Sequence, residues 1–131
     1  MAFERYRKKR EPIFAVQEHH ARQFHCDFRL EVNGVLKSWA VPKGVPEKAG
    51  IKRLAIQTED HPLEYANFSG AIPEGLYGAG VVKIWDRGKY VMEKIKDKEI
   101  IVELFGKKLK GKYVLVKTKF SKNSWLIFRK K

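Results

Sequence analysis

Three of the chain's four histidines lie close together in the stretch QEHHARQFHCDFRLEVNG, which covers residues 17–34. His19 and His25 offer imidazole nitrogens and Asp27 offers a carboxylate, a mixed ligand set that suits zinc, manganese or iron. The set has none of the thiolates of a structural zinc site, and three ligands leave positions open for water or substrate. A polar strand face turned to water would produce the same spacing, so the pattern alone leaves a metal centre and a solvated face both open.

The segment HCDFRLEV (25–32) has the alternation of a half-buried strand. Successive side chains point to opposite faces, so Asp27 and Arg29 share the face of His25, while the apolar residues between them form the core side. His19 lies six residues before His25, across an expected turn, and can fold back onto the same spot. The segment therefore predicts two histidines, one acid and one arginine on a single polar face.

The Asn33-Gly34 pair predicts a tight hairpin between this strand and VLKSWAV (35–41). In that register Arg29 lies opposite Ser38, and the polar face meets the small residues Ser38 and Ala40. Small neighbours leave room above the polar face. We therefore expect this face to hold a ligand rather than to pack against other side chains.

A second segment, RLAIQTEDH, repeats the combination of arginine, acid and histidine. Strict alternation places Arg53, Glu59 and His61 on one face. Arginine forks bind phosphate oxygens, a metal polarises a phosphoryl group, and a histidine moves a proton near neutral pH. If both polar faces point into one cleft, the combination favours hydrolysis of a phosphate ester over redox chemistry, and a protonated His61 would add positive charge beside the arginines.

The elements that must position these residues are short β-type runs separated by turn residues. The sequence predicts strands at 13–17, 25–32, 35–41 and 53–60, then a meander through VVKIWD, KYVMEKI, EIIVELF, KYVLVKT and SWLIFRK, with one helical turn near HARQF. The pattern predicts a mostly β fold, a small compact antiparallel β-barrel with short flanking helical turns. Residues 1–12 are expected to form a basic N-terminal arm and residues 13–131 a single domain.

The net charge of +13 is unevenly distributed along the 131 residues. Residues 13–88 carry nine bases and nine acids, whereas residues 89–131 carry fourteen bases and four acids. A segmental excess of this size attracts polyanions, nucleic acid above all. No apolar run is long enough for a membrane helix, the N-terminus is too charged for a secretory signal, and the lone Cys26 fits a reducing compartment. We therefore expect a cytoplasmic monomer that binds nucleic acid and no membrane.

The stretches FAVQEHHARQFHCDFRLEVNGVLKSWAVPKG and RLAIQTEDHPLEYANFSGAIPEGLYGAGVVKIWDRG closely resemble the 3′-phosphoesterase domain of bacterial ATP-dependent DNA ligase D and its free-standing relatives. The resemblance runs from about residue 13 to 88. It implies metal ligation by His19, His25 and Asp27, with Mn²⁺ as the cofactor and Zn²⁺ or Co²⁺ as other candidate divalent metals. It implies phosphate-handling and catalytic roles for Arg29, Arg53, His61, Tyr65, Lys43 and Glu59. Tyr65 and Lys43 come from the resemblance alone, since nothing in their spacing marks them.

The same resemblance implies an activity on DNA or RNA 3′ ends in a primer-template. A terminal 3′ ribonucleoside is removed by a phosphodiesterase step, and the remaining 3′-phosphate is hydrolysed to a 3′-OH. The implied partners are a DNA ligase and a polymerase of an end-joining pathway. The family commonly has an acid where this chain has His20 and an aromatic residue where it has Cys26, and neither position is a motif ligand.

Two alternatives use the same residues differently. Two histidines and one carboxylate in a barrel are also the ligand set of Fe(II) oxygenases, although that chemistry leaves Arg29 and Arg53 with little to do. A non-catalytic nucleic-acid-binding barrel would account for the basic final third and leave the histidine cluster unexplained.

Overall fold

A computed structural model describes residues 11–76 and 79–131 of the chain. These residues form nine β-strands and one short 3₁₀ helix, η1 (Leu63–Asn67). The strands are β1 (Ile13–His20), β2 (His25–Val32), β3 (Val35–Val41), β4 (Lys52–Pro62), β5 (Gly70–Ile72), β6 (Gly80–Lys96), β7 (Glu99–Phe105), β8 (Lys110–Lys117) and β9 (Ser124–Arg129).

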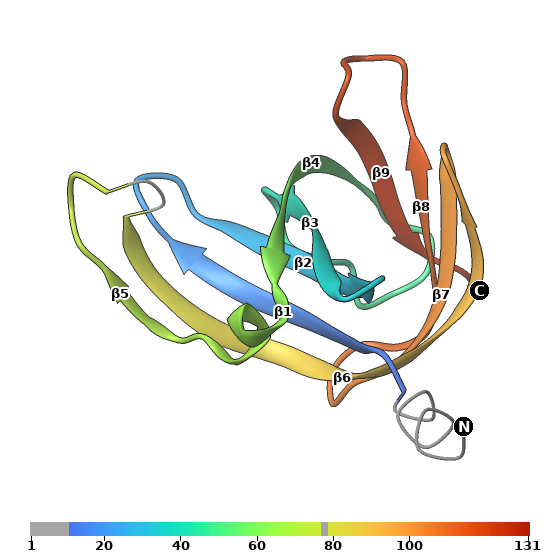
Figure 1. Cartoon of the computed structure of the whole chain (residues 1–131). Helices are drawn as coiled ribbons and strands as arrows, with labels where there is room; N and C mark the ends of the chain where they lie inside the picture. Colours follow the sequence, from blue (N-terminus) through green and yellow to red (C-terminus); the bar gives the residue numbers. More distant parts are fainter. Residues whose placement is uncertain (1–10, 77–78) are drawn as a thin grey trace.

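Eight of the strands close into an antiparallel barrel (Figure 1). The order around the barrel is β1-β2-β3-β4-β9-β8-β7-β6, and pairing between β6 and β1 closes the ring. The short β5 lies outside this ring and pairs only with the start of β6. The predicted fold is therefore confirmed. The basic arm predicted for residues 1–12 lies outside the described residues except for its last two positions.

Several element boundaries differ from the sequence prediction. The runs VVKIWD and KYVMEKI belong to one long strand, β6, whose first half pairs with β1 and whose second half pairs with β7. Gly88 lies where the second pairing begins, and a Cβ atom there would be 2.3 Å from the carbonyl oxygen of Phe105. The helical turn expected near HARQF is wrong, because residues 21–23 form a bend, and the helical turn is η1 instead. Within the described residues no helix is long and apolar enough to cross a membrane.

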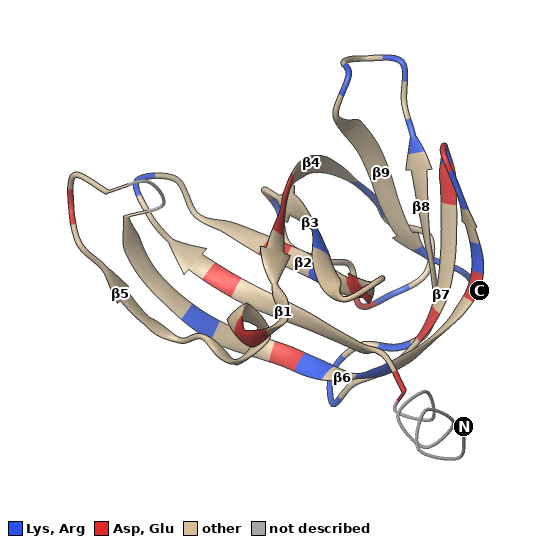
Figure 2. Ribbon diagram, in the orientation of Figure 1, with Lys and Arg blue, Asp and Glu red and all other residues tan. Residues whose placement is uncertain are grey.

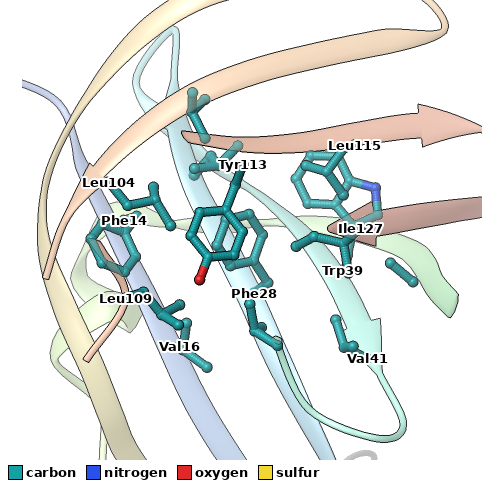
Figure 3. Close-up of a cluster of buried hydrophobic side chains, with 14 of the residues drawn as sticks. Phe14, Val16, Phe28, Trp39, Val41, Leu104, Leu109, Tyr113, Leu115 and Ile127 are labelled. Carbon is teal, nitrogen blue, oxygen red and sulfur yellow. The ribbon is translucent and has the colours of Figure 1, made fainter. Parts of the chain in front are cut away.

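The barrel interior is filled by aromatic and aliphatic side chains from every wall (Figure 3). Trp39 packs edge-on against Trp125 with ring centroids 5.8 Å apart, and Phe28 lies 6.3 Å from Trp39. These rings come from β2, β3 and β9, so the core joins β9 to strands that are not its neighbours in the barrel. The predicted alternation of β2 is confirmed, because Cys26, Phe28 and Leu30 all belong to this core.

A buried carboxylate fixes the point where the barrel closes. Asp86 on β6 pairs with Val16 on β1 and is only 4% exposed. Its two oxygens accept backbone N–H bonds of 2.8–3.0 Å from Arg87, Lys107, Lys108 and Leu109. Four donors fill the acceptor sites of an ionised carboxylate. Asp86 therefore holds the turn between β7 and β8 against the seam between β1 and β6.

Candidate active site

His19, His25, Asp27 and Arg29 lie on the outer face of the barrel wall, on the side of β1 and β2 opposite the core. Alternation places Ala15 and Gln17 on this outer face, because Phe14 and Val16 belong to the interior cluster. The helix η1 packs over the same face, where Ala66 contacts Ala15 in a small second apolar cluster. Figure 1 shows η1 as the short green coil after β4, between β1 and β6 in this view, before the chain turns into β5. A cleft of about 920 Å³ lies between this outer face and the part of the chain that runs from η1 to β5.

The two histidines and the acid converge at one end of this cleft. His19 and His25 are directly opposite in the β1–β2 register, and Asp27 follows two residues later on the same face. The distance from His19 Nδ1 to His25 Nε2 is 3.2 Å, and His25 Nε2 lies 3.2 Å from Asp27 Oδ1. One ligand atom from each residue fits within 4.8 Å, and no other such group occurs in residues 11–76 and 79–131.

The chemistry of this cluster fits a divalent cation. Asp27 raises the pKa of His25, mainly through the hydrogen bond between them and against the effect of burial. Two imidazole nitrogens and a carboxylate oxygen that point at one spot are a ligand set for Mn²⁺, Zn²⁺ or Co²⁺. Because the cluster lines the cleft, a metal there would keep coordination positions facing the open space.

Arg29 lies beside this cluster and is 3% exposed. Its Nη2 atom is 3.2 Å from Asp27 Oδ2, its Nε donates to Gln17 Oε1 at 2.6 Å, and its Nη1 donates to Ser38 Oγ at 2.7 Å. Burial lowers the pKa of Arg29, and Asp27 opposes this shift. A guanidinium remains cationic in proteins, so the wall carries a buried positive charge held in a fixed orientation.

Gln17 and Ser38 complete the support of Arg29, and sequence reasoning did not assign them a role. Gln17 Nε2 donates to the carbonyl oxygens of Tyr65 at 2.6 Å and Phe68 at 3.1 Å. Ser38 Oγ donates to the carbonyl of Leu36 and accepts from the arginine. The available signals were the position of Gln17, two residues before His19 on the same strand face, and the predicted pairing of Ser38 with Arg29, which is confirmed.

A bulge in β4 decides which of its residues reach the cleft. His61 pairs with Leu36 and Thr58 pairs with Ser38, so β4 has one extra residue between these two pairs. The extra residue shifts the alternation, and both Thr58 and His61 line the cleft. The expectation that Arg53 and His61 share one face is therefore wrong. That expectation assumed a regular strand, and the bulge interrupts the regular alternation of side chains.

His61 sits against Arg29 as an acceptor. The distance between Arg29 Nη1 and His61 Nδ1 is 3.1 Å, and the carbonyl oxygen of Glu59 is 3.0 Å from the same nitrogen. The guanidinium can only donate and the Glu59 carbonyl can only accept, so Nδ1 serves one of them at a time and accepts from Arg29 in the tautomer with the proton on Nε2. Burial first, and the charge of Arg29 second, lower the pKa of His61. The neutral imidazole is therefore the form that faces the cleft at neutral pH.

Tyr65 reaches the site from η1. Its ring lies 4.8 Å from the guanidinium carbon of Arg29 and 4.9 Å from the His61 ring, and it stacks on Phe68 at 5.0 Å. Burial raises the pKa of the Tyr65 hydroxyl, so this group keeps its proton at neutral pH. The residue implied only by the family resemblance thus lies next to the two residues that spacing had singled out.

The remaining predicted residues are more dispersed. Glu59 lines the cleft, but Arg53 and Lys43 do not. Arg53 Nη1 donates to the carbonyl oxygens of Lys43 at 2.8 Å and Gly44 at 2.9 Å, beside the loop that follows β3. The catalytic roles of Arg53 and Lys43 remain predictions that this geometry does not support directly. His20 lies at the rim with its ring edge-on to Phe24 at 5.0 Å.

Comparison with known proteins identifies related chains. The family model for the DNA Ligase D 3′-phosphoesterase domain matches residues 17–117. The chain is 55% identical over 122 residues to the multifunctional non-homologous end joining DNA repair protein LigD of Mycobacterium tuberculosis. It is 51% identical over 129 residues to the LigD protein of Mycolicibacterium smegmatis, and 45% identical over 125 residues to that of Pseudomonas aeruginosa. Each match covers 90% of this chain and 15–17% of the relative, so the chain spans about one sixth of their length.

Proposed function

The chain belongs to the family of the DNA ligase D 3′-phosphoesterase domain, and on this premise we propose that it is a metal-dependent phosphoesterase that repairs nucleic-acid 3′ ends. Two reactions are proposed, removal of a 3′-terminal ribonucleoside by phosphodiester hydrolysis and removal of a 3′-phosphate, which together leave a 3′-OH. One observation carries the proposal. A cluster of metal-ligand type, a buried arginine and a neutral histidine line the same cleft.

His19, His25 and Asp27 are the residues that would hold the ion, with Mn²⁺ proposed and Zn²⁺ or Co²⁺ compatible with the same ligands. When bound, such an ion polarises the phosphoryl group and lowers the pKa of a coordinated water. The ligands come from paired strands of the barrel wall rather than from a loop, so their positions are fixed by the sheet.

Arg29 would orient the phosphate. Within the described structure, four of its five N–H groups are directed at Gln17, Ser38, His61 and Asp27, and one N–H on Nη2 is left for a phosphate oxygen. Because the other four bonds fix the guanidinium, the charge needs little reorganisation when the substrate binds. Preorganised charge of this kind stabilises the transition state of phosphoryl transfer.

His61 would supply a proton or a hydrogen bond. In the tautomer whose Nδ1 accepts from Arg29, Nε2–H is the donor left for the substrate. The leaving oxygen is the 5′ oxygen of the ribonucleoside in the diesterase step and the 3′ oxygen in the removal of the phosphate. It takes the electron pair of the broken P–O bond and requires a proton, which the Tyr65 hydroxyl can donate while Nε2–H of His61 donates a hydrogen bond to the phosphate. His61 is outside the three-residue ligand cluster, so a role as fourth ligand has less support.

The relatives are multifunctional non-homologous end joining proteins, which supports a proposal for the biological setting. We propose that this chain prepares DNA or RNA 3′ ends of primer-templates for the polymerase and ligase of such a pathway. A cytoplasmic monomer is proposed for this task.

A direct test uses a 5′-labelled primer-template that ends in a 3′-phosphate or a single 3′-ribonucleotide. Incubation with Mn²⁺ is expected to convert both ends to 3′-OH, as resolved on a sequencing gel, and chelation or His19→Ala is expected to stop both conversions. Binding without product in the presence of Mn²⁺, Zn²⁺ and Co²⁺ would instead support the non-catalytic barrel. A requirement for iron and a 2-oxoacid would support the oxygenase.

A further inference from the structure

The turn between β8 and β9, residues 118–123, presents an aromatic ring to solvent. Phe120 is 82% exposed, more than any other large hydrophobic residue of the described chain, whereas Phe28 on the wall of the barrel is fully buried. Scattered exposed apolar residues are normal, so exposure alone does not mark a site, but the burial of this ring in the folded protein stabilises little. A ligand is therefore the natural partner to consider.

Hydrogen bonds hold this turn in a defined shape. The backbone N–H and the hydroxyl of Thr118 both donate to the carbonyl oxygen of Ser124, at 2.8 and 3.1 Å. The N–H of Phe120 donates to Thr118 Oγ1 at 3.3 Å, and Ser124 N–H donates to the carbonyl of Ser121. The ring is thus carried by an ordered turn, which Figure 1 shows extending past the end of the barrel.

The turn is surrounded by positive charge. Lys117, Lys119 and Lys122 flank Phe120, and residues 104–131 hold ten bases and no acid. Figure 2 shows Lys and Arg, and no acidic residue, along the turn between β8 and β9. An aromatic ring among lysines matches the chemistry of single-stranded nucleic acid, which has stacked bases and a charged backbone.

The turn ends beside the candidate cleft. The carbonyl oxygen of Asn123 accepts the backbone N–H of Gln57 at 2.8 Å, and the next residue, Thr58, lines the cleft. Phe120 lies three residues from Asn123, so the chain between them spans at most about 11 Å. A strand whose 3′ end occupies the cleft could therefore reach Phe120 within a few nucleotides.

We propose that this turn is a second nucleic-acid contact, in which the Phe120 ring stacks on a base upstream of the 3′ end while Lys119 and Lys122 pair with backbone phosphates. The contact is independent of sequence, because every base has a π-face. Its position relative to the 3′ end rests on the proposed function. A second copy of the chain is a poorer occupant, since two such turns would bring like charges together.

The test is a double-mutant cycle that measures whether removal of the Phe120 ring and removal of a single base affect binding affinity independently. Wild type and Phe120→Ala are titrated with a labelled single strand of twelve deoxythymidines that ends in 3′-OH, and then with strands that carry one abasic site at successive positions. Wild type is expected to lose about 5- to 10-fold in affinity at one position near the 3′ end. Phe120→Ala is expected to show the same loss on the intact strand and no further loss at that position.

Control variants separate stacking from other contacts. Phe120→Trp is expected to retain binding, and Phe120→Leu to behave like Phe120→Ala. Phe105→Ala removes a ring that is 53% exposed on β7 and is expected to bind like wild type. The proposal would be overturned if Phe120→Ala bound the intact strand with wild-type affinity. It would also be overturned if the loss of affinity in Phe120→Ala added to the loss at every abasic position. A change from dimer to monomer on substitution of Phe120, measured by sedimentation, would likewise overturn it.

Turnover distinguishes this proposal from the proposed function. Phe120→Ala is expected to hydrolyse a dinucleotide 3′-phosphate at the wild-type rate, because that substrate cannot span the cleft and the turn. If wild type shows the coupling between Phe120 and one base but hydrolyses no substrate, the second nucleic-acid contact is supported and the proposed phosphoesterase activity is contradicted. Hydrolysis without coupling would contradict the contact alone.

Discussion

At the scale of single residues, Arg29 is the centre of the candidate site. It connects an acid of the ligand cluster, a histidine of the cleft and the glutamine that holds η1. A buried charge is tolerated only when it is paired and hydrogen-bonded, and Arg29 meets both conditions before any substrate arrives. The same contacts mean that changes at neighbouring residues act partly through this arginine.

Asp27→Asn tests the ligand assignment. A neutral amide is a poor ligand for a divalent cation, so we expect Mn²⁺ affinity, measured by calorimetry, to fall at least about 100-fold and turnover to be nearly lost. The stability of the folded protein should also fall, because Arg29 loses its nearest charge partner. Arg29→Lys is the matched control, since it disturbs the same pair and leaves the three ligands in place. Native Mn²⁺ affinity in Asp27→Asn would contradict the assignment.

His61→Gln tests the role of the imidazole outside the ligand cluster. We expect turnover to fall by about 10²–10⁴ while Mn²⁺ affinity stays within about threefold of wild type. The contrast depends on His61 lying beside Arg29 rather than among the ligands. Parallel loss of turnover and metal affinity would show that His61 binds the metal.

The protonation state of His61 gives a separate expectation. Its folded pKa lies below the usual 6.5, so the unfolded chain binds more protons between the two values. The contribution to stability is therefore fully present above pH 6.5 and is lost as the pH falls toward the folded pKa. We expect NMR titration of His61 to give a pKa below 6.5 with the proton on Nε2 in the neutral form. A neutral form with its proton on Nδ1 would contradict the acceptor role of that nitrogen.

At the scale of elements, the β2–β3 hairpin was predictable and the bulge in β4 was not. Asn33 has a positive φ of 52° and Gly34 one of 84°, the backbone that this turn requires, and the Arg29–Ser38 pairing follows from it. The bulge in β4 has no comparable sequence signal, because it depends on how β3 pairs with residues 58–61. Long-range pairing thus decided that His61 reaches the cleft and that Arg53 does not.

The helix η1 shows the same limit of sequence reasoning. Its five residues carry no side-chain cap, and it is held by Gln17 Nε2 on the carbonyls of Tyr65 and Phe68. Those partners lie 48 and 51 residues from Gln17 along the chain, so no local pattern could reveal them. Only the family resemblance pointed to Tyr65.

Gln17→Glu tests whether this contact positions Tyr65. The change keeps an oxygen for Arg29 and removes both donors to the carbonyls, so we expect a loss of about 1–3 kcal/mol in unfolding free energy. Hydrogen exchange should become faster in residues 63–70 while β2 stays protected. Gln23→Glu in the exposed turn after β1 is the control and should change neither quantity. Unchanged exchange in η1 would mean that packing alone holds the helix.

At the scale of the whole molecule, the closed barrel separates the site from the core. The ligands project from the outer face of a wall whose inner face fills the barrel, so closure of the barrel fixes the spacing of the strands that carry them. Asp86 is part of this closure, because it joins the β1–β6 seam to the turn between β7 and β8.

Asp86→Asn is therefore expected to destabilise the entire barrel. An amide in this position retains one acceptor oxygen and turns its own N–H groups toward buried donors, which should cost about 3 kcal/mol in denaturant unfolding. Asp97→Asn, in the exposed turn between β6 and β7, should stay within about 0.5 kcal/mol of wild type. A variant at Asp86 as stable as that control would show that the turn does not depend on the carboxylate.

The distribution of charge over the molecule leads to a last expectation. Most of the basic excess, +10 of the net +13, lies in residues 89–131, which include the second half of β6 and all of β7, β8 and β9. Substitution of Lys107, Lys108 and Lys110 by glutamine should weaken DNA binding and flatten its dependence on salt. Each lysine that neutralises a phosphate of a single strand contributes about 0.7 to the slope of log affinity against log salt. Because these lysines lie outside the cleft, hydrolysis of a small phosphodiester should remain close to wild type.

The control replaces Lys37 and Lys48, which belong to the charge-balanced part of the chain, and should leave the slope unchanged. Equal slopes for all three proteins would mean that the basic segment is only a solvated surface and that the cleft alone holds the strand.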